Sequence, residues 1–109
     1  MRLQIINYVS LEGVDVFDQW LRSIRDKTAR AAIGRRILRL GRGNAGDHRY
    51  LRNGVTEMRI DIGPGYRAYY GQVGEIVVLL LCGGDKSSQD VDIERAIDYL
   101  AAWKSVNRK

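Results

Sequence analysis

Apolar side chains in the first quarter of the chain follow a pattern that predicts a strand and then an amphipathic helix. Residues 1–9 mix Leu, Ile, Tyr and Val in a way typical of a strand. Over residues 11–25, apolar residues return every three or four positions, so that they share one face of a predicted helix. The repeating positions are Val14, Phe17, Leu21 and Ile24, and Trp20 widens the face.

The next segment predicts a second helix, over residues 27–41, with one apolar and one basic face. Asp26 is suited to cap its start, because an Asp side chain accepts hydrogen bonds from the first free amide groups of a helix. The faces consist of Ile33, Ile37 and Leu40 on one side and Arg35, Arg39 and Arg42 on the other. Closely spaced glycines then end the helix and predict a loop that runs to about Gly54.

The second half of the chain is predicted to form a three-stranded meander followed by a helix. Residues 55–62 alternate in side-chain direction, residues 66–70 are rich in aromatic side chains, and residues 75–82 are almost wholly apolar. Such an apolar run indicates a strand covered on both faces, or one whose second face meets a partner. A last helix begins at about Asp90. The predicted order is therefore β-α-α-β-β-β-α, in a single α+β domain over residues 1–109.

Charge adds a prediction about partners. The chain of 109 residues has 18 Lys and Arg against 13 Asp and Glu, a formal net charge of +5. Ten of the basic residues and only two of the acidic ones lie between Arg22 and Arg52. The excess is therefore local, and a local positive field favours a polyanionic partner. The alternative is a basic helix face that only contacts solvent.

Composition excludes several classes of site. With one Cys and one His, the chain forms neither an intrachain disulfide nor a Cys-rich or multi-histidine metal site, and we expect no metal or cofactor. The longest apolar run, residues 76–82, is far shorter than the roughly 20 residues that span a bilayer. The N-terminus lacks the pattern of a signal peptide. We therefore expect a cytoplasmic protein, in which Cys82 is a buried structural thiol rather than a nucleophile.

Three segments of the second half carry a resemblance to a known family. Residues 57–60 read E-M-R-I, residues 63–70 read G-P-G-Y-R-A-Y-Y, and residues 79–89 read L-L-L-C-G-G-D-K-S-S-Q. Together with the order of the helices, they resemble the RelE/ParE toxin superfamily, and within it the phage-derived addiction module killer proteins close to the HigB-type toxins. The resemblance implies a small antiparallel sheet packed with an N-terminal helical hairpin and a C-terminal helix.

The resemblance also implies a function, the toxin of a type II toxin–antitoxin system with a helix-turn-helix antitoxin as its partner. RelE-like members cleave mRNA in the ribosomal A site, so the leading expectation is a metal-independent endoribonuclease that acts on ribosome-bound mRNA. ParE-like members instead poison DNA gyrase, and a shared fold leaves that second target open.

Three cations are expected to take part in catalysis, two of them through the resemblance and one through its place on the neighbouring strand. Arg67 matches the arginine of the family's G-Y-R strand, a phosphate-contacting position, and Lys86 matches the basic residue at the end of the last strand. Arg59 lies on the neighbouring strand, and a hairpin through the Gly-Pro-Gly turn can place it beside Arg67, as a guanidinium pair suited to phosphate. The alternative is that the arginines only form ion pairs and that Lys86 only caps its loop; the acidic neighbours are Glu57, Asp61 and Asp85.

A further group of residues is expected to bind RNA. It comprises Arg35, Arg39, Arg42, Arg49, Arg52 and Tyr69. The arginines of the second helix would contact phosphates without reading sequence, or receive an acidic antitoxin segment, and Tyr69 is favoured over Tyr66 and Tyr70 for stacking on bases. His48 is interpreted as solvated rather than catalytic, and the sequence does not identify a general base.

Overall fold

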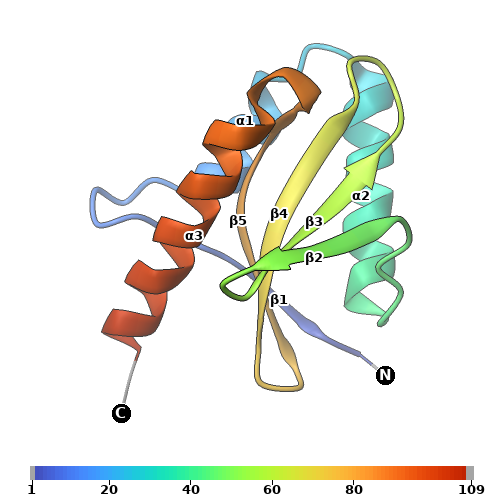
Figure 1. Cartoon of the computed structure of the whole chain (residues 1–109). Coiled ribbons are helices and arrows are strands. Elements are labelled where there is room, and N and C mark those ends of the chain that lie inside the picture. Colours follow the sequence, from blue (N-terminus) through green and yellow to red (C-terminus); the bar gives the residue numbers. More distant parts are fainter. Residues whose placement is uncertain (1, 108–109) are drawn as a thin grey trace.

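The computed structural model describes residues 2–107, which form a five-stranded sheet with helices on both faces (Figure 1). In chain order the elements are strand β1 (Gln4–Asn7), helices α1 (Val16–Ser23) and α2 (Lys27–Gly41), strands β2 (His48–Arg52), β3 (Val55–Ile60), β4 (Tyr66–Val73) and β5 (Val77–Asp85), and helix α3 (Gln89–Val106). A 3₁₀ turn, Lys86–Ser88, joins β5 to α3. The strands lie in the order β1-β5-β4-β3-β2, with β1 parallel to β5 and the other neighbours antiparallel.

The apolar side chains form two cores, one on each face of the sheet. On one face, Phe17 of α1 and Ile33 of α2 cluster with Met58 of β3. On the other face, Leu100 of α3 clusters with Leu81 of β5. Strand β5 contributes to both cores, which confirms that its unbroken apolar run belongs to a strand covered on both faces.

The structure contains one strand more than the sequence predicts. The sequence predicts a loop up to about Gly54, but His48–Arg52 form β2 and pair antiparallel with β3. Asn53 and Gly54 join the two strands, and both have positive φ (54° and 85°), as the tight turn of a twisted hairpin requires. The predicted order is therefore wrong here, because four antiparallel strands rather than three follow α2.

The two elements at the start of the chain also differ from expectation. The resemblance implies an antiparallel sheet. Because β1 runs parallel to β5, the sheet is instead mixed. Helix α1 begins at Val16 and not near residue 11, because the carboxylate of Asp15 accepts from the Asp18 amide and caps the helix there. The Asp26 cap of α2 and the α+β class are confirmed. Within residues 2–107, no helix has both the length and the apolar character needed to cross a membrane.

Cys82 lies buried in β5, as predicted for a structural thiol. Burial raises the pKa of this thiol to about 12, and the nearby Asp92 carboxylate adds to the shift. Because the thiolate is the reactive form, we expect the folded protein to resist a thiol reagent at about pH 8 and the unfolded chain to react at once. The release of thionitrobenzoate measures both rates, and rapid labelling of the folded protein would contradict this expectation.

Candidate functional site

Two arginines face each other across strands β3 and β4. Arg59 and Arg67 are directly opposite in the antiparallel register, so their side chains leave the same face of the sheet. Both line a cleft of about 240 Å³ near the turn that joins the two strands. The other residues that line this cleft are Asp47, Ile60, Asp61, Gly65 and Tyr66. The predicted juxtaposition of the two arginines is confirmed.

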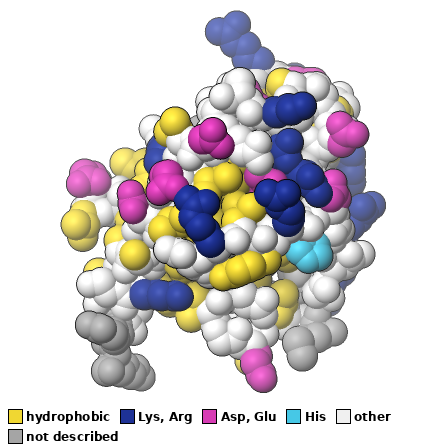
Figure 2. All heavy atoms as spheres, in the orientation of Figure 1, with side chains coloured by type: hydrophobic (Ala, Val, Ile, Leu, Met, Phe, Trp, Pro, Cys, Tyr) yellow, Lys and Arg dark blue, Asp and Glu magenta, His cyan; other side chains and the backbone are white. Residues whose placement is uncertain are grey.

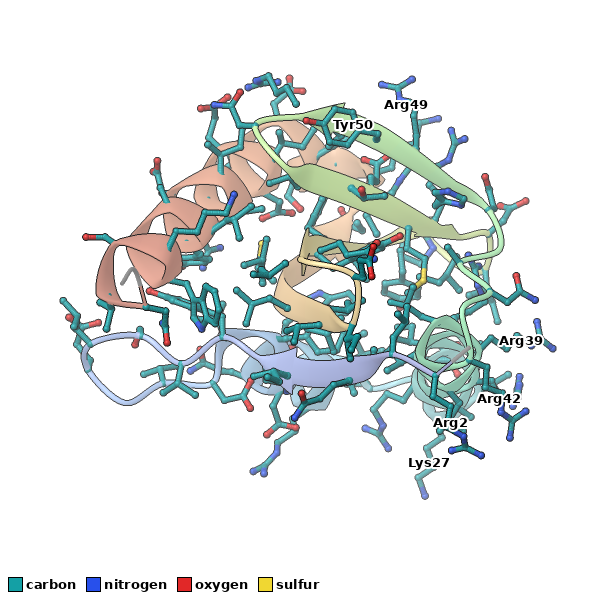
Figure 3. All side chains as sticks on the ribbon, turned by 90° about the horizontal axis from the view of Figure 1, so that it is seen from below. Arg2, Lys27, Arg39, Arg42, Arg49 and Tyr50 are labelled. Atoms are coloured by element: carbon teal, nitrogen blue, oxygen red, sulfur yellow. The ribbon has the colours of Figure 1, made fainter. Side chains whose placement is uncertain are left out.

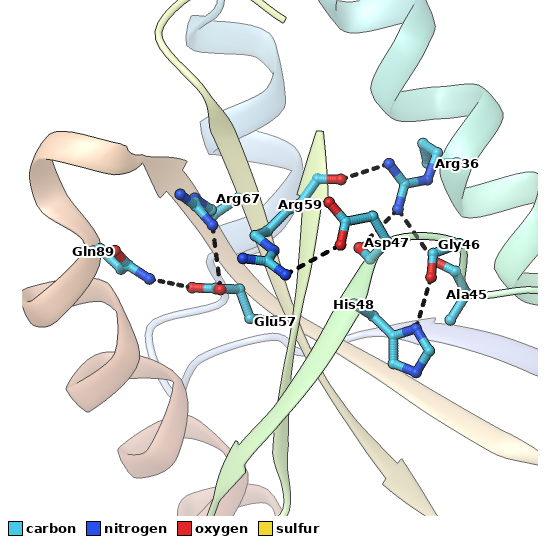
Figure 4. Close-up of polar contacts among 9 residues, drawn as sticks. All are labelled: Arg36, Ala45, Gly46, Asp47, His48, Glu57, Arg59, Arg67 and Gln89. Carbon is cyan, nitrogen blue, oxygen red and sulfur yellow. Dashed lines mark hydrogen bonds and ion pairs between the residues drawn. The ribbon is translucent and has the colours of Figure 1, made fainter. Parts of the chain in front are cut away.

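A buried carboxylate holds Arg67. Glu57 is 1 % exposed, and its Oε1 lies 3.3 Å from a guanidinium nitrogen of Arg67 (Figure 4). Its Oε2 accepts hydrogen bonds from the Tyr69 hydroxyl at 3.3 Å and from the Gln89 amide at 2.7 Å. Three donors therefore hold the Glu57 carboxylate in place. Because the Arg67 side chain is only 13 % exposed and pairs with this carboxylate, it is held in one orientation. The ion pair considered as an alternative role for Arg67 therefore exists, and it also aims the guanidinium group.

Tyr69 is fully buried, so the prediction that it stacks on RNA bases is wrong. Strand parity correctly places it on the same side as Arg67, but α3 covers that part of the face. Burial and then the Glu57 carboxylate raise the pKa of Tyr69 far above its ordinary value. The hydroxyl therefore stays protonated and serves Glu57 as a hydrogen-bond donor.

Arg59 is the more exposed member of the pair, and its partner is not among the acidic residues expected. The carboxylate of Asp47 lies 3.2 Å from a nitrogen of Arg59, and both side chains are partly exposed. Arg36 of α2 supports this arrangement by donating to the carbonyl groups of Arg59, Ala45 and Asp47 at 2.6, 3.1 and 3.0 Å. Sequence reasoning does not single out Arg36. The signal that could have found it is its position in α2, because it lies outside the exposed face of Arg35 and can therefore turn toward the sheet.

Lys86 is exposed and lies beside the cleft. Its Cβ is 3.7 Å from the point that a Cβ on Gly65 would occupy. The neighbouring Asp85 is engaged elsewhere, because its carboxylate accepts from the hydroxyl and the amide of Ser87, and these bonds lower the pKa of Asp85. Within residues 2–107 no ion pair involves Lys86, so its ammonium group is available to an anion.

The residues predicted to bind RNA do not form one surface. Arg39 and Arg42 project from α2, whereas Arg49 lies on β2 at a different side of the molecule (Figure 3). Arg52 forms an ion pair with Glu94 of α3. Helix α2 contains no acidic residue, and all three arginines of its predicted basic face are exposed. The outer face of α2 is therefore a basic stripe that stands apart from the cleft.

The face on which β2 crosses in front of the sheet mixes both charges. Figure 2 shows basic side chains near the middle of this face, close to the single histidine, with acidic side chains around them. His48 is exposed, as predicted, and its Nδ1 donates to the Gly46 carbonyl at 2.8 Å. In the described part of the chain, no three His, Cys, Asp or Glu side chains are grouped to hold a metal ion. The chemistry that the cleft offers is that of guanidinium and ammonium groups set among carboxylates.

No protein-family model matches the chain. An uncharacterized protein of Haemophilus influenzae (strain Rd) is 49 % identical to it over 88 residues, which cover 81 % of this chain and 89 % of the relative. This chain belongs to the family of that Haemophilus protein. A segment of 88 residues starts no later than residue 22 and ends no earlier than residue 88 of the chain. The shared segment therefore contains Glu57, Arg59, Arg67 and Lys86.

In this member of the family, segments far apart in sequence meet at the cleft. Strand β3 supplies Glu57 and Arg59, and β4 supplies Arg67. The segment after β5 supplies Lys86 beside the cleft and Gln89 against Glu57. Each of these side chains except Lys86 is fixed by a hydrogen bond or ion pair, so the two guanidinium groups at the cleft are held in place by the protein itself.

Proposed function

We propose that this protein is the toxin of a type II toxin–antitoxin pair and that it cleaves mRNA on the ribosome. The observation that carries the proposal is the Arg59–Arg67 pair, which lines a polar cleft with Lys86 beside it. Guanidinium groups bind phosphate oxygens bidentately and stay charged in any environment. We also propose, from the resemblance of the sequence, that the protein is a RelE/ParE toxin and shares the detailed topology of that superfamily.

The proposed cleavage uses the 2′-hydroxyl of the RNA as the nucleophile. This oxygen attacks the adjacent phosphorus, the 5′-oxygen leaves and takes up a proton, and cations offset the charge that builds on the phosphorane. Arg67 suits the central position, because Glu57 already orients it and no reorganisation is needed during the reaction. Asp47 and Asp61 line the cleft, and their carboxylates are the proposed acceptors for the proton of the 2′-hydroxyl.

A second candidate function, a non-enzymatic toxin that binds DNA gyrase, is favoured by a different observation. In the free protein both arginines already pair with carboxylates, Arg59 with Asp47 and Arg67 with Glu57. A nuclease must exchange at least the Asp47 carboxylate for a phosphate oxygen, whereas a protein-binding toxin can use the paired surface as it stands. In both cases we propose a cytoplasmic protein that a helix-turn-helix antitoxin neutralises.

A cell-free translation reaction separates the two candidates. We expect the purified protein to cut a reporter mRNA at codons in the ribosomal A site, as mapped by primer extension. Lys86→Ala should reduce cutting by roughly tenfold or more, because it removes a charged hydrogen-bond donor to the phosphate. The matched control is Lys27→Ala, since Lys27 is also an exposed lysine but lies at the start of α2. Intact mRNA, together with gyrase-dependent DNA breaks in a supercoiling reaction, would contradict the nuclease and support the second candidate.

A further inference from the structure

Tyr50 is the one exposed aromatic side chain among the residues that the structure describes. It is 62 % exposed, whereas the other eight aromatic residues of the chain are buried or half-buried. Its position on an edge strand leaves one side of that strand free of any partner strand. The ring therefore contributes little to either core and is accessible to a ligand.

A hydrogen bond fixes the far end of this side chain. The hydroxyl of Tyr50 accepts from the Gly54 amide at 3.0 Å, across the turn that joins β2 to β3. Because the ring is tethered at both Cα and hydroxyl, little side-chain freedom is left to lose when a flat ligand lies on it. An exposed ring that is already oriented is a better stacking platform than a freely rotating one.

The strand around Tyr50 is basic. Residues 48–54 (H-R-Y-L-R-N-G) include no Asp or Glu, and Arg49 is exposed and takes part in no ion pair within residues 2–107. His48 and Tyr50 are two residues apart on the strand, so they project from the same side of it, and Arg49 between them projects from the other side.

We propose that β2, as the edge strand of the sheet, binds single-stranded RNA that crosses this edge, with one base stacked on Tyr50 on one side of the strand and a neighbouring phosphate on Arg49 on the other side. An aromatic ring for a base and a cation for the backbone are the two elements of single-strand recognition. Figure 3 shows Tyr50 and Arg49 together on β2, away from Arg39 and Arg42 on α2. Arg49 is free of ion pairs in the described part of the chain, which favours an anionic ligand, and an exposed ring favours unpaired bases over a duplex.

The inference rests on the proposed function and adds to it a binding site for mRNA outside the cleft. Strand β2 leads away from Asp47, which lines the cleft, and Tyr50 is three residues further along the chain. Tyr50 therefore lies roughly 10 Å from Asp47 along the strand. The arginine pair lies on the same side of the sheet as Arg49, and Tyr50 projects from the other side of the edge strand. One RNA strand that passes over this edge can thus have a phosphate at the arginine pair and a nearby base on Tyr50.

Fluorescence anisotropy with labelled oligo(A) of about ten nucleotides tests the inference. We expect Tyr50→Leu to weaken binding about tenfold, within the roughly 5- to 150-fold range of base–aromatic stacking, and Tyr50→Trp to bind at least as tightly as the wild type. Binding of an RNA duplex of equal length should not change. Ile76→Ala is the matched control, because it also shortens an exposed apolar side chain (58 %) but lies in the turn between β4 and β5.

Three results would overturn the inference. They are wild-type protein that does not bind oligo(A), Tyr50→Leu protein that binds it as tightly as the wild type, and Tyr50→Leu protein that loses duplex and single-strand binding equally. Loss of antitoxin binding with unchanged RNA binding would instead assign Tyr50 to a protein interface. The assay contains no ribosome, so its failure is distinct from that of the proposed function: protein that cuts mRNA but ignores Tyr50→Leu refutes the stacking site alone. Thermal unfolding of each variant shows that the fold is intact.

Discussion

Replacement of Arg67 by alanine is expected to abolish mRNA cleavage and to destabilise the fold. The guanidinium group is the cation opposite the Glu57 carboxylate, and both side chains are largely withdrawn from water. Removal of one partner leaves a buried charge without compensation, which typically lowers the free energy of unfolding by about 3–5 kcal/mol. The alanine variant therefore loses the phosphate-binding group and the packing of the cleft together. Primer extension in a translation reaction and urea unfolding measure the two losses.

Arg67→Lys separates the catalytic loss from the structural one. Lysine keeps a positive charge near Glu57 but lacks the planar fork that binds a phosphate bidentately. We expect this variant to keep most of the stability and still to cut mRNA about 100-fold more slowly, as when a preorganised donor is removed from a transition state. The control is Arg22→Ala, because Arg22 forms only an exposed ion pair with Asp18 on α1. Wild-type cutting by Arg67→Lys would remove Arg67 from the proposed chemistry.

The parts of the fold that sequence predicts are those with a strong apolar period. The bounds of α2 are predicted correctly, because its apolar face and its Asp26 cap are both local signals. Strand β2 has no such period, since most of its side chains are exposed and basic. The signal that was available is the pair Asn53-Gly54, a strong mark of a tight hairpin turn. The parallel pairing of β1 with β5 has no local signal, because it joins residues more than 70 positions apart.

For the candidate site, the alternation of side chains along the strands predicts the position of some residues correctly and misleads for others. The opposition of Arg59 and Arg67 follows from the turn between two strands, which is local. The same reasoning treats Glu57 as a surface partner, although α3 covers it and Gln89 binds it from a distance of 32 residues. The ion pair of Arg59 with Asp47 depends on the extra strand β2. Asp47 directly precedes this strand, and the pairing of β2 with β3 brings it alongside Arg59. Contacts between distant segments are thus what sequence reasoning could not supply.

The two glycines near the end of β5 should tolerate no side chain, although neither has a positive φ. The apolar run predicts a strand that ends at residue 82, but the structure continues β5 to Asp85 and buries both glycines within it. A Cβ on Gly83 would overlap the indole ring of Trp20, and a Cβ on Gly84 would overlap the carboxylate of Asp92. Neither neighbour is free to move: Trp20 packs on the core beneath α1 and α2, and Asp92 is buried and accepts from the Ser88 hydroxyl at 2.5 Å.

We therefore expect Gly83→Ala and Gly84→Ala each to lower the free energy of unfolding by about 3 kcal/mol or more, since overpacking of this severity forces main-chain shifts. Gly34→Ala is the matched control and should have the opposite sign. Gly34 lies inside α2 with open space around it, so an added methyl group should stabilise the helix by about 0.5–1 kcal/mol. Urea unfolding followed by circular dichroism compares all three variants. If steric overlap is the cause, Trp20→Leu combined with Gly83→Ala should cost less than the sum of the two single changes, and strict additivity would show that the ring is not what excludes the side chain.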